Sequence, residues 1–321
     1  MKTIYTFSLV SALAICAFGS ISAQTSENGK LISRSPYKRA PFDAVKGLEK
    51  VVSREEYETA FRDDRFEMET VKYSSDGIIV SAFLFGPKVK TGKLPVIVFN
   101  RGGYIRGDIG HEILPFAYRF AKIGFIVIAP MYRGSDGAAG KDEVGGGDVD
   151  DLMNVVPLLQ TVPEADTKNL FLYGESRGGM MVFQALRDGF PANAAATFGG
   201  FSDFNMLISS DPKLYEPLIK MIWPDFEAKK SEIVNRRSAV RWADKINTPI
   251  FLMHGGADRS VDPQQTLNLA TQLQKLGKNY ELLIYNGDDH TLSHNQVDRD
   301  SRVAIWFKKF IKKMKTHVTN H

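Results

Sequence analysis

The sequence predicts an α/β fold, in which helices cover both faces of a mostly parallel sheet. From residue 95 onward, short runs of apolar, often β-branched residues alternate with longer amphipathic runs. The short runs are apolar at successive positions, which is typical of strands that are buried on both faces. The amphipathic runs between them are long enough for the helical crossovers that parallel strands require.

The composition is that of an ordinary globular chain. Its 321 residues are 43% hydrophobic and 24% charged, which is enough to bury a substantial core in one large domain. The 41 basic and 37 acidic residues give a formal net charge of +4. The basic residues are scattered except for pairs at 308–309 and 312–313, which we interpret as the solvated face of a last amphipathic helix. This pattern gives little support for nucleic-acid binding.

Residues 1–23 have the organisation of an export signal. Lys2 supplies a positive start, residues 4–18 form an apolar stretch too short for a comfortable membrane span, and Ala23 ends a small-residue cleavage site. We therefore expect removal of this segment and export to the periplasm or the medium. Cys16 is the sole cysteine, and the bulky Ile15 before it argues against a lipoprotein anchor. The mature chain then has no disulfide, no thiolate nucleophile and no cysteine-ligated metal.

The segment 24–65 is predicted to precede the main domain, which we place at 66–316. Its first part is polar and reads as a loose lead-in, and residues 42–61 have a helix-like pattern. Residues 66–73 and 78–85 alternate around a turn and predict an antiparallel strand pair.

Strand and helix patterns then alternate along the main domain. The predicted strands are 95–99, 125–129, 170–173, 194–198, 250–253 and 280–285; the predicted helices are 113–123, 149–159, 179–187 and 263–276, followed by a C-terminal helix. An insertion at 201–247 follows the fourth strand, and we expect it to form a small helical cap over the end of the sheet. No internal repeat is present.

Ser176 lies at the centre of the pentapeptide Gly-Glu-Ser-Arg-Gly, residues 174–178, between a predicted strand and a predicted helix. The glycines let the backbone pass through a sharp, strained turn, so the hydroxyl projects above the sheet edge. The helix N-terminus points its free N–H groups at that hydroxyl. A serine in this setting is typical of a nucleophile.

A serine hydroxyl is a poor nucleophile until a neighbouring base accepts its proton. Loops at the carboxyl ends of the strands are where such groups gather. His290 directly follows the last predicted strand, whereas the alternative, His294, lies closer to the final helix. We therefore predict that His290 is the base.

The base needs a carboxylate that fixes its tautomer and stabilises the imidazolium. Asp258 follows the strand at 250–253 and is the predicted acid. Its alternative role is that of a turn or helix-capping residue, although Asp262 is better placed for the cap. Asp288 and Asp289 are interpreted as polar groups of the loop that carries the histidine. His254 reads as a partly buried residue at a strand exit, and nothing around it has metal-ligand spacing.

Acyl transfer also needs hydrogen-bond donors for the oxyanion. The backbone N–H of Arg177 follows the nucleophile at the helix start, and a second N–H is expected from Arg101 or Gly102 in the loop after the strand at 95–99. The guanidinium of Arg101 is expected to pair with an acid such as Asp108 or Asp136, with binding of a substrate carboxylate as the alternative.

Three residues are candidates for contact with substrate. Besides Arg101, Tyr104 lies in the same loop, and Trp223, before Pro224 in the cap insertion, is expected to be partly exposed. Most other aromatic and Met residues of the insertion are expected to form its own core. We expect substrate choice to reside in this insertion.

Taken together, these motifs resemble the α/β-hydrolase fold and, within it, the catalytic domain of the prolyl oligopeptidase family of serine peptidases. The resemblance covers roughly residues 66–310 and rests on these segments: Gly102-Gly103, Tyr-Arg-Gly-Ser at 132–135, Gly-Asp-Val-Asp-Asp at 147–151, Gly-x-Ser-x-Gly-Gly at 174–179, His-Gly-x-x-Asp-x-x-Val at 254–261, and His290. Two departures stand out. The short segment before the first strands cannot hold the β-propeller that peptidases of the family commonly carry, and Arg101 replaces a residue that is often His or Tyr.

The resemblance and the residues together predict an exported serine hydrolase with a Ser176-Asp258-His290 triad. The first hypothesis is a peptidase that acts on short peptides or aminoacyl derivatives. A carboxylesterase, acting on acyl or carbohydrate esters, is the alternative because the same triad serves ester substrates. The third hypothesis is a non-catalytic secreted binding protein with the same fold. No cofactor and no metal are implied, since serine, base and oxyanion donors complete hydrolysis with water alone.

Overall fold

A nine-stranded sheet forms the centre of the chain in the computed structural model, which describes residues 27–104 and 106–313. The strand order is β1-β2-β3-β5-β4-β6-β7-β8-β9. The strands are β1 (Leu31–Pro36), β2 (Phe66–Ser75), β3 (Ile78–Pro87), β4 (Leu94–Asn100), β5 (Ile126–Pro130), β6 (Ala165–Glu175), β7 (Ala194–Phe198), β8 (Ile250–Gly255) and β9 (Tyr280–Tyr285). The first three are antiparallel, and β5, β4 and β6 to β9 run parallel to one another. The predicted α/β fold is therefore confirmed. The predicted signal and Cys16 lie outside the described residues.

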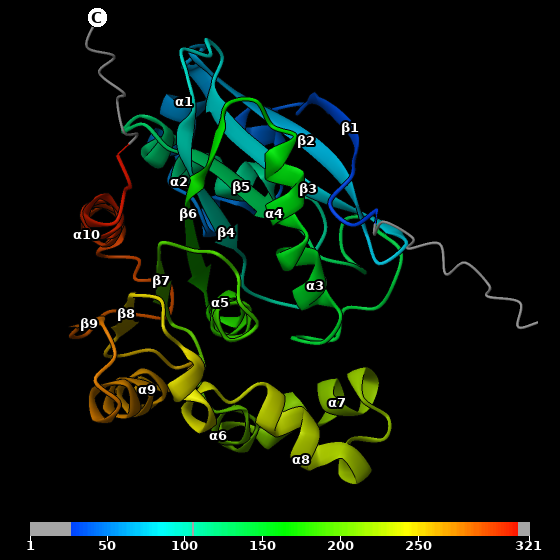
Figure 1. Cartoon of the computed structure of the whole chain (residues 1–321), viewed down its shortest axis with the longest axis vertical. Coiled ribbons are helices and arrows are strands. Elements are labelled where there is room, and N and C mark those ends of the chain that lie inside the picture. The colour runs from blue at the N-terminus through cyan, green and yellow to red at the C-terminus, as the bar shows by residue number, and fades with distance from the viewer. Residues whose placement is uncertain (1–26, 105, 314–321) are drawn as a thin grey trace, which may run out of the picture.

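Helices cover both faces of this sheet (Figure 1). One face packs against α1 (Arg54–Arg62), α2 (Gly110–Ala121) and α10 (Gln296–Lys309), and the other against α3 (Asp148–Met153), α4 (Val155–Gln160), α5 (Arg177–Arg187) and α9 (Gln264–Lys275). Alternate residues of the central strands belong to opposite cores. Val96 and Val98 of β4 lie in one cluster of buried residues, while Ile97 and Phe99 lie in the other. This two-sided burial explains why the strands read as continuous apolar runs.

The lead-in contains one strand that the sequence did not predict. Residues 31–36 form β1, which pairs antiparallel with β2 at the edge of the sheet. An edge strand contacts the sheet on one side only, and most of its side chains are exposed or half-buried. Its polar Ser and Arg residues therefore carry no apolar strand pattern.

Two predicted helices are broken. Within 42–61, Gly47 has φ 83°, and two short 3₁₀ turns (Phe42–Ala44 and Leu48–Lys50) precede α1, which begins after the capping side chain of Ser53. The pattern at 149–159 is split into α3 and α4, and Pro157 lies in the second helix. Proline has no N–H to continue the hydrogen bonds of the preceding turn, which agrees with the break.

The insertion at 201–247 contains three helices, α6 (Phe204–Ser210), α7 (Pro212–Ile222) and α8 (Phe226–Arg236), and two 3₁₀ turns, Ala239–Arg241 and Ala243–Lys245. These helices gather at one end of the molecule beside α5 (Figure 1). Within the described residues, no helix combines the length and apolar character that a membrane crossing requires.

Candidate active site

Ser176 occupies a strained turn between β6 and α5. Its backbone has φ 52° and ψ −120°, a conformation that costs free energy for a non-glycine residue and is held by the surrounding packing. A Cβ on Gly174 would lie 2.4 Å from the carbonyl oxygen of Gly178, and a Cβ on Gly178 would lie 1.9 Å from that of Asn100. Both glycines are therefore required by close backbone contacts.

Asp258 and His290 form a hydrogen-bonded pair. The Nδ1 of His290 donates to Oδ2 of Asp258 at 2.7 Å, which leaves Nε2 as the nitrogen available to a substrate or nucleophile. Asp258 follows β8 and His290 follows β9. A Cβ on Gly199 would lie 3.1 Å from the imidazole Nδ1, so the backbone after β7 packs closely against the ring.

Ser176 and His290 line one cavity of about 380 Å³. No hydrogen bond joins the two side chains in the described part of the chain, and such catalytic hydrogen bonds often tighten only when substrate is bound. The structure thus brings the predicted nucleophile, base and acid to one place. Their catalytic roles stay a prediction.

A second histidine, His254, also binds the predicted acid. Its Nε2 donates to Oδ2 of Asp258 and to the carbonyl of Val261, both at 3.0 Å, and its Nδ1 lies 2.7 Å from Oγ1 of Thr266. Because both partners of Nε2 are acceptors, that nitrogen carries a proton. The side chain is fully buried, so the expected strand-exit histidine is instead a second partner of the acid.

The carboxylate of Asp258 is fully engaged. Its Oδ1 accepts the backbone N–H groups of Ser260 and Val261 at 2.8 and 2.9 Å. Burial by itself would raise the pKa of Asp258, but the hydrogen bonds from His254 and His290 outweigh it and hold the pKa well below its usual range. Asp258 is therefore an ionised partner for the imidazolium that forms during proton transfer.

The loop after β9 is held by its own aspartates. Asp288 is buried and accepts from Asn295 at 2.7 Å and from Nδ1 of His294 at 3.0 Å. Asp289 accepts from the backbone N–H of Thr291 and from the hydroxyl of Ser293. These bonds agree with the interpretation of both aspartates as polar groups of the loop. His294, the alternative base, is hydrogen-bonded to Asp288. Ligand atoms of Asp288, Asp289 and His294 lie within 4.8 Å of one another, but these hydrogen bonds already account for the cluster.

The loop after β4 lies against the nucleophile turn. A Cβ on Gly102 would lie 3.2 Å from Cβ of Ser176, so the backbone of Gly102 reaches the position expected of an oxyanion donor. The Gly102 N–H donates to Oε1 of Glu175 at 3.1 Å. The oxyanion roles of Gly102, Arg101 and Arg177 stay predictions.

The side chain of Arg101 is buried beneath this loop, and the residue is one of those that line the cavity. Its guanidinium donates to the carbonyls of Tyr104 and Met131 at 2.8 and 2.7 Å and to the hydroxyl of Ser135 at 2.7 Å. The nearby carboxylate is Asp142, at 3.8 Å, so the expected pairing with Asp108 or Asp136 is wrong. Burial lowers the pKa of Arg101 to about 10, which still leaves it charged at neutral pH.

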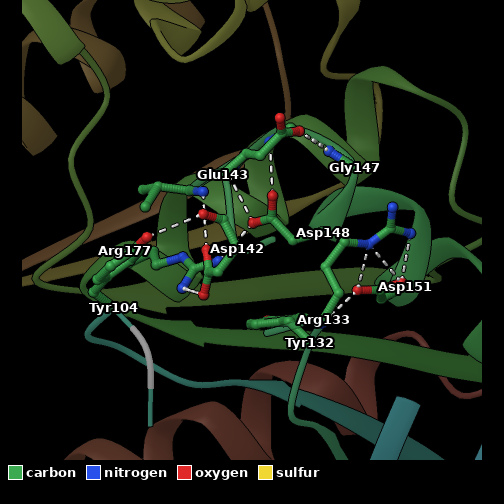
Figure 2. Close-up of polar contacts among 12 residues, drawn as sticks. Tyr104, Tyr132, Arg133, Asp142, Glu143, Gly147, Asp148, Asp151 and Arg177 are labelled. Carbon is green, nitrogen blue, oxygen red and sulfur yellow. Dashed lines mark hydrogen bonds and ion pairs between the residues drawn. The ribbon is translucent and has the colours of Figure 1, made fainter. Parts of the chain in front are cut away.

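Arg177 ties the start of α5 to two loops (Figure 2). Its guanidinium donates to Asp142 at 2.7 Å, to Asp148 at 2.5 Å and to the carbonyl of Gly103 at 3.1 Å. Burial would lower the pKa of Arg177, but the two carboxylates outweigh it and raise the pKa. This buried cluster holds the residue after the nucleophile against the predicted oxyanion loop.

Two other substrate candidates turn inward. Trp223 is 9% exposed and packs against Phe204 and the guanidinium of Arg237, so the prediction of partial exposure is wrong. Its neighbours are the aromatic residues of the cap's own core. Tyr104 is half-buried, and its hydroxyl donates to the carbonyl of Asp142 at 3.3 Å.

The cavity is walled by segments other than the cap. None of its lining residues belongs to 201–247. The lining comes from the lead-in, the loop after β4, α2, the nucleophile turn, the end of β7, the loop of His290 and α10. The apolar lining residues are Val51, Val52, Phe99, Ile109, Ile113, Pro115, Phe116 and Phe198. We expected the insertion at 201–247 to control substrate choice, and the residues that line this cavity do not support that expectation.

Comparison with known proteins shows the family to which the chain belongs. Residues 116–314, more than half of the chain, match the sequence model of the prolyl oligopeptidase family. The chain belongs to this family of serine-type peptidases. It is 29% identical over 241 residues to the uncharacterized peptidase YtmA of Bacillus subtilis, covering 74% of this chain and 92% of that protein.

Larger peptidases resemble the chain over part of their length. It is 27% identical to the human acylamino-acid-releasing enzyme, covering 75% of this chain and 35% of the enzyme. A puromycin-hydrolyzing peptidase of Mycobacterium tuberculosis superposes with a TM-score of 0.65 at 23% identity, covering 76% of this chain and 40% of that one. The chain thus spans well under half of these two proteins, and the structural likeness shows the shared α/β-hydrolase fold.

Proposed function

We propose that the chain is an exported serine peptidase that hydrolyses short peptides or aminoacyl derivatives through Ser176, His290 and Asp258. The observation that carries the proposal is the hydrogen bond of 2.7 Å between Asp258 and His290, which lines the same cavity as Ser176. Family membership supports peptide bonds as the substrate class. The relatives include peptidases and an acylamino-acid-releasing enzyme.

The chemistry follows from these positions. Oγ of Ser176 attacks the scissile carbonyl while Nε2 of His290 takes its proton. Asp258 keeps Nδ1 protonated and stabilises the imidazolium. The imidazolium then gives its proton to the leaving amine, and a water activated by the same nitrogen hydrolyses the acyl-enzyme. Backbone N–H groups of Arg177 and Gly102 would stabilise the oxyanion in both steps.

Covalent labelling tests whether Ser176 is a nucleophile. A fluorophosphonate probe should modify the folded protein at Ser176 and at no other serine, as read by mass spectrometry of the peptides. Absence of labelling in folded protein would support the non-catalytic binding protein instead. Heat-denatured protein is the control, because only the assembled site activates this hydroxyl.

The substrate class is tested by comparing amides with esters that share an acyl group. We expect measurable kcat/KM on aminoacyl nitroanilides as well as on nitrophenyl esters. Rapid ester cleavage with no detectable amide cleavage would overturn the peptidase assignment in favour of a carboxylesterase. The discriminating step is protonation of the leaving amine, which amides require and activated esters do not.

Export rests on the sequence of residues 1–23. Expression with and without this segment should place the full-length product outside the cytoplasm and the truncated product inside it. The exported product should begin at Gln24 when its N-terminus is sequenced. Retention of residues 1–23 in a cytoplasmic product would contradict the proposal.

A further inference from the structure

Glu175 places a carboxylate on a predicted oxyanion donor. This residue precedes the nucleophile, lines the cavity, and accepts the backbone N–H of Gly102 through Oε1 at 3.1 Å. A Cβ on Gly102 would lie 3.2 Å from the same Oε1, so the carboxylate packs directly against the loop. The N–H expected to receive the negative charge of the reaction is therefore already bonded to a negative group.

The other charges of the cavity are paired. Arg106 binds Glu112 at 2.6 Å, and Arg119 binds Glu56 at 3.0 Å and Asp300 at 2.6 Å. Arg299 is paired with the same aspartate at 2.8 Å. Among the described residues, no Lys, Arg or His nitrogen lies within ion-pair distance of Glu175, and Gly102 is its one hydrogen-bond donor. Glu175 is thus a cavity carboxylate that no charged side chain among these residues binds directly. Burial acts to lower the pKa of Arg299, and the charge of Glu175 is one of those that act to raise it.

A carboxylate here without a directly bound cation opposes catalysis. The oxyanion would develop beside Ser176 and compete with Oε1 for the Gly102 N–H, and two negative groups at this range repel each other. A positive group on the substrate changes the competition between Glu175 and the oxyanion for the Gly102 N–H. It would pair with Glu175, draw the carboxylate from Gly102 and release the donor for the oxyanion.

We propose that Glu175 selects substrates that carry an ammonium group on the acyl side of the scissile bond. This inference rests on the proposed function of the triad and names the substrate class that the triad acts on. A free α-ammonium is separated from the scissile carbonyl by one carbon, so it reaches a carboxylate next to the oxyanion site. The apolar lining of the cavity then suits the side chain of the same residue. A lysine side chain could supply the same charge, and the two sources are separated experimentally.

The test compares three acyl groups, each as nitroanilide and methyl ester: phenylalanyl with a free amine, N-acetyl-phenylalanyl and N-acetyl-lysyl. We expect the wild-type protein to favour phenylalanyl over N-acetyl-phenylalanyl by about tenfold or more in kcat/KM, as is typical of a charge pair in a partly desolvated site. This preference should fade as the pH rises past about 8, where the α-amine loses its proton. If N-acetyl-lysyl is favoured instead, the side chain is the source of the charge.

Substitution of the carboxylate decides the proposal. Glu175→Gln should remove most of the preference by lowering kcat/KM for the cationic substrate, while Glu175→Ala, which frees the Gly102 N–H, should raise kcat/KM for N-acetyl-phenylalanyl. Glu227→Gln, which removes an exposed carboxylate on α8, is the charge-matched control and should leave the preference intact. Thermal melting checks that each variant is folded.

The outcomes separate two failures. In the first case, fluorophosphonate labels Ser176 and the substrates are cleaved, but Glu175→Gln leaves the substrate preference unchanged or lowers kcat/KM equally for all substrates. The proposed role of Glu175 is then wrong, while the proposed triad is retained. If the wild type is neither labelled nor active on any of the substrates, the proposed function itself fails. Labelling of Glu175→Gln should be at least as fast as that of the wild type, since the probe carries no ammonium group and the substitution removes the negative charge beside the oxyanion site.

Discussion

His254 and His290 donate hydrogen bonds to the same carboxylate oxygen, Oδ2 of Asp258. One imidazole is fully buried and the other faces the cavity. The buried ring is itself fixed by Thr266 and by the carbonyl of Val261. We infer that His254 is a positioning residue, which acts on the reaction through the predicted acid.

His254→Phe should test this role while keeping a ring in the buried site. The variant removes one donor from Asp258, so the carboxylate presents more negative charge to His290. We expect kcat to fall by about tenfold or more, in the range typical of lost partners that orient a catalytic group. The acid limb of the pH profile of kcat/KM should move to higher pH. A fall in activity without movement of that limb would indicate a merely structural role.

Ser176→Ala and His290→Ala should each lower kcat by on the order of 10⁴-fold or more, because triad residues act as a unit. Ser176 is half-buried in a turn that its neighbours hold, and alanine keeps the Cβ, so the first variant should retain the melting temperature of the wild type. Circular dichroism and steady-state kinetics provide the two readouts. Combining both substitutions should cost little more than either alone, and additive losses would argue against a shared mechanism.

Arg177→Met should destabilise the protein by about 3–5 kcal/mol, the usual cost of leaving buried charges without their partner. The substitution keeps an unbranched side chain but leaves Asp142 and Asp148 without the guanidinium that both bind. Arg302→Met is the matched control, since the ion pair of Arg302 with Asp298 is half-exposed. It should change the free energy of unfolding by about 0–1 kcal/mol in urea denaturation. Equal effects of the two variants would contradict a structural role for the buried cluster.

The loop that carries His290 should loosen in acid. Partial burial acts to raise the pKa of Asp289, but hydrogen bonds from Ser293 and Thr291 outweigh it and lower the pKa to about 2. Since the folded value lies below the unfolded value of about 3.9, this carboxylate stabilises the folded loop above pH 4 and loses that effect as the pH falls toward 2. The protection factors of the amides at 291–293, which correct for the intrinsic exchange rate at each pH, should fall over that window. Asp289→Asn should show faster exchange already at pH 6, and unchanged protection would contradict the prediction.

The sequence predicted those parts of the fold that depend on local patterns. The central strands are buried on both faces, so their apolar runs are visible without knowledge of the sheet order. The glycines at 174 and 178 mark the nucleophile turn for a similarly local reason, since only glycine fits the close backbone contacts. β1 was missed because an edge strand can be polar.

The contacts that tune the site were not predictable in the same way. The bond of Glu175 to Gly102 joins the ends of two different strands, and the second imidazole on Asp258 depends on how the segment after β8 folds back. The ion partners of Arg177 follow from a loop path between β5 and α3 that has no regular structure. The direction of Trp223 was misjudged because a neighbouring proline does not show which face of the cap is buried.

Val51, Val52 and Glu56 belong to the wall of the cavity, yet they precede residue 116, where the match to the family begins. Part of the cavity wall is thus supplied by a stretch of polypeptide that does not carry the reacting groups. Relatives that share the segment with the reacting groups can therefore differ in substrate preference where their N-terminal segments, equivalent to residues 27–65, differ. Grafting residues 27–65 from one relative onto another is, by this architecture, a route to altered selectivity that leaves the nucleophile untouched.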